Sequence, residues 1–111
     1  MLIIRNEQIE ALKSDRQTKF IKKVYKYLIQ DHNDKISSLQ KNEIENIIIL
    51  GIEKSALYKI SSEKAITLYI VIMLILGIDF DTNPHYDWAK EILINEEYQE
   101  SEKIQKLSQE I

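Results

Sequence analysis

AITLYIVIMLILGIDFD, residues 65–81, is the stretch that decides the fold of this 111-residue chain. No other segment of the sequence is apolar on all sides, and a helix without a polar face must be covered all round. We therefore predict that it forms the central helix of a small bundle, from about Glu63 to Leu76. Ser61 or Ser62 can cap its start, and Gly77 stands where a helix commonly ends.

The composition favours an all-α protein with one core. A chain of 111 residues, 44% of them hydrophobic and 30% charged, is long enough for one domain, which we place over residues 1–111. With only two glycines and one proline, tight turns are scarce, so long helices with short connections are expected. The sequence thus predicts a compact bundle of four to five helices around the central apolar helix.

Two further helices are predicted before the central one. The first begins at Asn6, its apolar stripe continues to Leu28, and a polar interruption near Ser14 leaves open whether it is continuous or broken. Residues 31–38, DHNDKISS, have the composition of a loop. The second helix covers about residues 40–57. We expect Gly51 within it to let a neighbouring helix approach closely.

The C-terminal third predicts two more helices. Asn83 and Pro84 suit the cap and the first position of one of them, whose buried stripe contains Trp88. The last helix is expected from Ser101 onwards, because apolar residues then recur at helical spacing.

The sequence gives no sign of a membrane span or of secretion. The apolar run from Ile66 to Ile78 has 13 residues, whereas a membrane-spanning helix needs about 20. The first residues, MLIIRNEQIEAL, lack the basic start and long apolar stretch of a secretory signal. We therefore expect a cytoplasmic protein.

The formal charge of −3 is unevenly distributed along the chain. Residues 1–30 hold seven basic and three acidic side chains, whereas the remainder holds eight basic and fifteen acidic ones. The basic side of the first helix could contact phosphates or an acidic protein. A pI near 5.4, few arginines and the lack of a helix-turn-helix pattern argue against nucleic acid.

No arrangement of residues predicts an enzyme, a cofactor or a metal site. There is no cysteine, no glycine-rich phosphate loop and no recognisable nucleophile motif. The sequence DFDTN, residues 79–83, opens like a calcium loop, but Pro84 and Lys90 stand where that loop needs a glycine and a glutamate. Two interpretations stay open for this segment. Phe80 fills the core while Asp79 or Asp81 accepts hydrogen bonds in the turn, or the segment binds a partner together with Trp88.

Several segments together resemble a family of small helical bacterial proteins, the accessory proteins encoded beside spike-tip and toxin genes of type VI secretion and related polymorphic-toxin clusters. The resemblance covers most of the chain. It rests on the following residues: IRNEQIEAL at 4–12 with Arg5 and Gln8, Phe20, Gly51, Tyr58, LYIVIMLILGIDFD from Leu68, Pro84, Trp88-Ala89 and Ile92-Leu93.

The resemblance implies a non-enzymatic adaptor or chaperone-like protein that holds a secreted toxin or its spike carrier. An immunity protein that neutralises a toxin would come from the same clusters, and a small nucleic-acid-associated regulator is a third hypothesis. The partner-binding residues that we predict are the following: Arg5, Gln8, Tyr58, Asp79, Phe80, Asp81 and Trp88.

Overall fold

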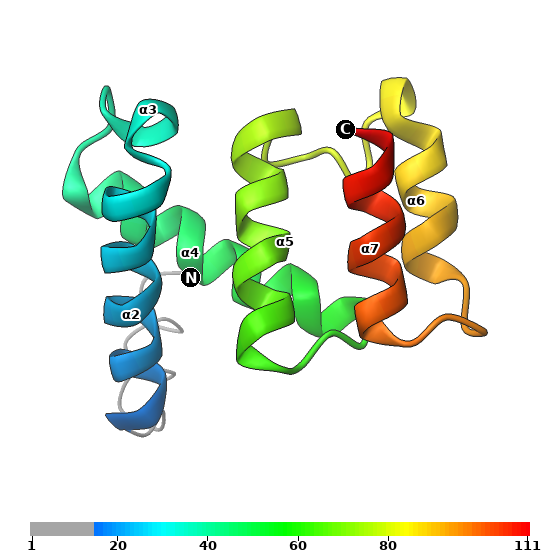
Figure 1. Cartoon of the computed structure of the whole chain (residues 1–111), viewed down its shortest axis with the longest axis horizontal. Coiled ribbons are helices and arrows are strands. Elements are labelled where there is room, and N and C mark those ends of the chain that lie inside the picture. Colours follow the sequence, from blue (N-terminus) through cyan, green and yellow to red (C-terminus); the bar gives the residue numbers. More distant parts are fainter. Residues whose placement is uncertain (1–14) are drawn as a thin grey trace, which may run out of the picture.

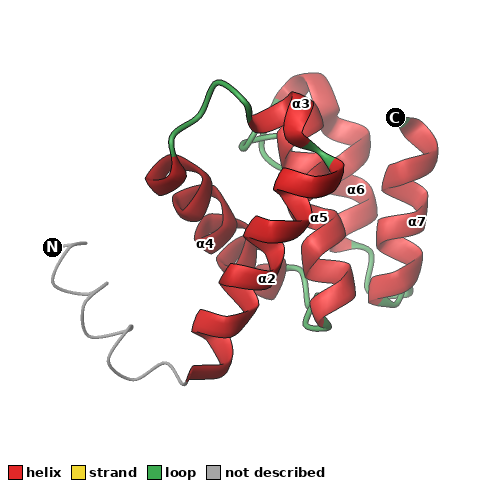
Figure 2. Cartoon of the chain, turned by 60° about the vertical axis from the view of Figure 1, so that its left-hand side comes forward, coloured by secondary structure: helices red, strands yellow, loops and turns green. Residues whose placement is uncertain are grey.

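The computed structural model describes residues 15–111 and confirms the all-α class (Figures 1 and 2). This part of the chain contains six α-helices, one short 3-10 helix and no strand, so it has one helix more than the four to five predicted. The elements are the following: α2 (Asp15–Asp31), α3 (Asn33–Ile36), α4 (Lys41–Leu57), α5 (Glu63–Leu76), η1 (Pro84–Tyr86), α6 (Asp87–Ile94) and α7 (Glu100–Glu110).

Helix α5 is central, as the apolar stretch predicts. Figure 1 shows it between α2 on one side and α7 on the other, with α4 crossing behind it. The helix spans Glu63–Leu76, and the Ser62 hydroxyl accepts a hydrogen bond from the Ala65 amide at its start. Gly77 ends it with φ +118°, a conformation that residues with a side chain rarely adopt.

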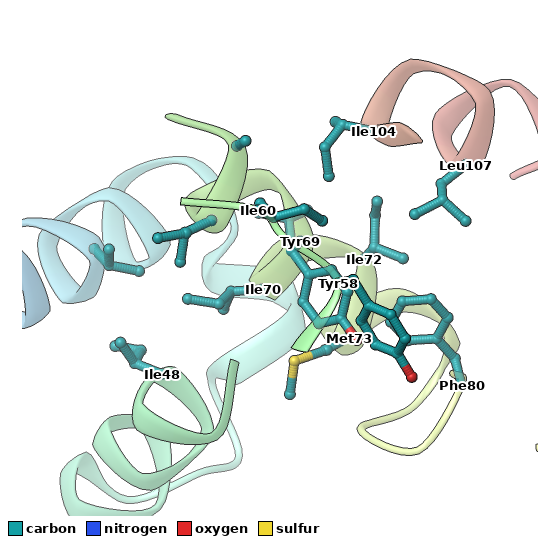
Figure 3. Packing of buried hydrophobic residues seen from close by; sticks show 14 of the residues in the cluster. Ile48, Tyr58, Ile60, Tyr69, Ile70, Ile72, Met73, Phe80, Ile104 and Leu107 are labelled. Carbon is teal, nitrogen blue, oxygen red and sulfur yellow. The ribbon is translucent and has the colours of Figure 1, made fainter. Parts of the chain in front are cut away.

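The core surrounds α5 and draws side chains from every helix of the described chain. Figure 3 shows Tyr69, Ile70, Ile72 and Met73 of this helix packed between residues of α4 and α7. Tyr69 and Ile70 are fully buried. At about 25 cal/mol per Å² of apolar surface removed from water, this all-round burial is what holds the bundle together.

Gly51 provides the close approach that the sequence predicts. A Cβ atom at this position of α4 would lie 2.4 Å from Cγ1 of Ile70 on α5, closer than carbon atoms can pack. The two helices therefore meet at a point where only glycine fits.

Two expectations about the connections were wrong. Residues 31–38 are not all loop, because they contain α3, whose Ile36 is buried in the core and holds the turn against the bundle. The α-helix expected at Pro84 begins at Asp87 instead. The Asn83 side chain does act as a cap, accepting a hydrogen bond from the His85 amide, but the turn that it opens is the 3-10 helix η1.

The N-terminal predictions lie outside the described residues. Arg5, Gln8 and the possible break near Ser14 all fall within residues 1–14, before α2 begins at Asp15. Within residues 15–111, no helix combines the length and the apolar character that crossing a membrane requires.

Candidate functional site: an acidic, aromatic groove on α6 and α7

Three of the predicted partner-binding residues are buried in the protein itself. Phe80 is 0% exposed, Asp81 3% and Tyr58 7%. The ring of Phe80 packs on Tyr69 with 5.2 Å between centroids, and Tyr69 also stacks with Tyr58 at 6.4 Å. Figure 3 shows the three aromatic rings together in the core. Of the two interpretations of residues 79–83, Phe80 thus follows the one in which it fills the core.

Asp81 is the centre of a buried polar cluster. Its carboxylate accepts a hydrogen bond from Lys54 Nζ on one oxygen and from the Tyr58 hydroxyl on the other, both at 2.7 Å. The Tyr58 hydroxyl accepts a further hydrogen bond from Lys90 Nζ at 3.2 Å, and the same ammonium group lies 5.4 Å from the centroid of the Tyr58 ring. Because these residues belong to α4, to the turn after α5 and to α6, the cluster ties three parts of the chain together.

A third lysine joins α7 to this cluster. Lys103 is only 4% exposed, and its Nζ donates a hydrogen bond of 2.9 Å to the backbone carbonyl of Tyr58. Burial lowers the pKa of Lys103, and the nearby charge of Lys59 lowers it further. This contact satisfies a carbonyl just beyond the end of α4, where the helix itself provides no partner.

The protonation states of the cluster favour a structural role. Burial by itself raises the pKa of Asp81, but the hydrogen bonds from Lys54 and Tyr58 outweigh it, so its pKa is lowered overall. Burial and the bond to Asp81 raise the pKa of Tyr58. Near neutral pH, Asp81 is therefore an anion that accepts and Tyr58 a neutral phenol that donates, and neither is poised to exchange a proton with a substrate.

Asp79 and Trp88 are the two predicted site residues that reach the surface of the described chain. The Asp79 side chain is exposed, while its backbone carbonyl accepts hydrogen bonds from the Thr82 and Asn83 amides and so forms the turn. Trp88 is half-buried on α6, with Tyr86 edge-on at 6.1 Å. Asp79 and Trp88 thus reach the surface, whereas Phe80 and Asp81 are buried.

Trp88 lines a surface groove of about 300 Å³ along the seam between α6 and α7. The lining residues that α6 contributes are spaced three or four residues apart, which places their side chains on one face of the helix. Tyr98 in the following turn and Glu110 near the end of α7 close the groove. The lining residues are Trp88, Glu91, Ile92, Asn95, Tyr98 and Glu110.

This groove combines aromatic surface with negative charge. Trp88, Ile92 and Tyr98 are partly buried, whereas the carboxylates of Glu91 and Glu110 are exposed. Aromatic faces and carboxylates both attract ammonium and guanidinium groups. Lys106 of the chain itself illustrates the contact, because its Nζ lies 4.9 Å from the centroid of the Tyr98 ring. The groove is therefore chemically suited to a lysine or arginine side chain of another protein.

The part of the chain that surrounds the groove is also negatively charged. Residues 79–111 carry nine acidic and three lysine side chains, whereas α2 carries five basic and two acidic ones. Figure 1, with the longest axis horizontal, shows α2 at one end of the molecule and α6 at the other. The protein thus has a basic end and an acidic end, and the groove lies on the acidic one.

Sequence reasoning found Trp88 but missed the acidic members of the groove. The spacing of Trp88, Glu91 and Asn95 on one helix face was a usable signal. Nothing in the sequence shows that Tyr98 and Glu110 lie beside them, because that depends on how α7 folds back on α6. Within residues 15–111, no three acidic or histidine side chains gather in a way that could hold a metal ion.

Comparison with known proteins identified no relative of this chain. No protein-family model matches the sequence, and no curated protein and no solved structure matches it either.

Proposed function

We propose that the chain is a non-enzymatic protein-binding module, an adaptor or chaperone-like protein that holds a secreted bacterial toxin or its spike carrier. The groove on α6 and α7 is the surface that contacts the partner. The proposal rests on one observation above all, the exposed part of Trp88 in the same groove as the exposed carboxylates of Glu91 and Glu110. The family resemblance of the sequence supplies the kind of partner.

The position of the groove suits binding. Tryptophan on a rigid helix loses little conformational freedom when it is covered, and such residues often carry most of the energy of an interface. The surrounding carboxylates would draw a basic segment toward the groove and speed its association. The buried cluster around Asp81 fixes α6 against α4, so the groove is held in shape before a partner arrives.

The same acidity supports a second candidate, an immunity protein. A toxin that cleaves nucleic acid must present a basic surface to its substrate, and an acidic face such as that of residues 79–111 could cover it. The net charge of −3 weighs against the third hypothesis, a nucleic-acid-associated regulator, because phosphates are repelled by the acidic end.

The test is to co-express the tagged chain with the proteins encoded on either side of its gene and to analyse what co-purifies on a sizing column. A neighbour should form a stable complex that is lost with Trp88→Ala and weakened with Glu91→Gln. Leu57→Ala and Glu53→Gln are matched controls, because both residues are exposed on α4, and Leu57 is 73% exposed. These two should leave the complex intact.

Other outcomes have distinct meanings. If Asp79→Ala disrupts the complex and Trp88→Ala does not, the turn after α5 rather than the groove is the binding surface. If no neighbour co-purifies, the proposed function is wrong. Assaying the toxin in the complex separates the two roles, because an immunity protein abolishes its activity and an adaptor leaves it active once released.

A further inference from the structure

The outer side of α2 carries a row of exposed lysines. Lys19, Lys22 and Lys26 follow one another at steps of three and four residues, so they share one side of the helix over about 10 Å. The opposite side holds the buried residues Phe20, Val24 and Leu28. The lysines therefore point away from the core.

These charges are not neutralised by the side chains that the structure describes. Lys23, on the flank of the row, pairs with Glu63 of α5 at 3.1 Å. Among the side chains of residues 16–111, no ion pair includes Lys19, Lys22 or Lys26. The sequence has no acidic residue from 16 to 30. Like charges at this spacing repel one another and destabilise a helix, and an acidic partner would relieve that repulsion.

We propose that this lysine row is a second docking site, and that it binds an acidic segment of another protein. Charge complementarity identifies the occupant. An acidic helix or strand need only be about as long as the row, so it would contact α2 without approaching the acidic residues at the other end of the molecule. The inference stands on α2 alone and does not depend on the groove.

A duplex nucleic acid fits the surface less well. A phosphate backbone extends well beyond the row and would meet a protein whose net charge is −3. Nucleic-acid footprints are usually domain-wide basic fields, whereas here the middle of the chain is neutral, with five acidic and five lysine side chains over residues 32–78.

The site has a consequence for the adaptor role. Because α2 and α6 lie at opposite ends of the longest axis (Figure 1), an acidic protein at α2 and a basic segment at the groove would not collide. One copy of the chain could then bridge two proteins of opposite charge.

The test uses the purified chain and a fluorescein-labelled poly-L-glutamate peptide of about 20 residues, followed by fluorescence anisotropy in about 50 mM salt, where charge interactions are only partly screened. The variant Lys19→Glu with Lys26→Glu should weaken binding at least about tenfold. The control is Lys59→Glu with Lys106→Glu, which changes the net charge equally at positions after α4 and on α7, off the row, and should change binding less than about twofold. Circular dichroism verifies that both variants are folded.

Three results would overturn the proposal. Equal weakening by both variants would show a response to net charge alone. A labelled DNA duplex that binds more tightly than the peptide and is lost with the same double variant would assign the row to nucleic acid. Sedimentation that shows the wild type dimerising and the row variant monomeric would make a second copy the occupant. Trp88→Ala should leave peptide binding unchanged, which keeps this test separate from that of the groove.

Discussion

Asp81→Ala is expected to lower the free energy of unfolding by about 3 kcal/mol, a large part of the stability of a small domain. Removing one partner of a buried ion pair typically costs about 3–5 kcal/mol, because the other charge is left uncompensated. Here Asp81 is 3% exposed, but the Lys54 side chain is 18% exposed and can turn toward water. The lower end of the range therefore applies.

The assay is urea unfolding followed by circular dichroism. With a slope of about 1.5 kcal/mol per molar urea, the midpoint should fall by about 2 M. Asp79→Ala is the matched control, since it removes the same group two residues away, where the side chain is exposed, and should cost less than about 0.5 kcal/mol.

A double-mutant cycle isolates the hydrogen bond within the cluster. Tyr58→Phe removes the hydroxyl that donates to Asp81, and combining it with Asp81→Ala should give a coupling of about 1 kcal/mol. Equal stability losses for Asp79→Ala and Asp81→Ala, with no coupling to Tyr58, would refute the structural role of the cluster.

Three other changes test the fold. Because the folded pKa of Asp81 lies below its unfolded value of about 3.9, its stabilisation is present above that pH and is lost as the pH falls through the folded pKa. The stability difference between wild type and Asp81→Ala in urea should thus shrink on acidification below about pH 4. Gly51→Ala should lower the melting temperature, because a contact of 2.4 Å with Ile70 belongs in the upper part of the overpacking range, about 2–3 kcal/mol, and exceeds the helix-propensity gain of about 1 kcal/mol. Ser62→Ala removes the cap on the Ala65 amide and should cost about 1 kcal/mol in chemical unfolding.

Local sequence signals were sufficient for the helices other than α3 and for their order. The central helix has the predicted bounds, Glu63–Leu76, because a serine that caps its start and a glycine that ends it act within a few residues. The close approach at Gly51 was also predictable, since glycine inside a helix is unfavourable unless a neighbour needs the space. Helix α3 was missed because its polar residues are typical of a loop, whereas in the structure the burial of Ile36 stabilises it.

The candidate sites depended on information that a linear pattern does not hold. An aspartate in a polar turn reads as exposed, yet Asp81 is buried because Lys54, 27 residues earlier, folds against it. The groove likewise exists only because α7 returns beside α6 and brings Glu110 to Trp88. The sequence by itself determined the helical class, the central helix and the basic side of α2, all of which follow from short-range periodicity and capping. The tertiary structure alone decided which charges are buried and which surfaces are shared between helices, because desolvation and contact depend on segments that are distant in the chain.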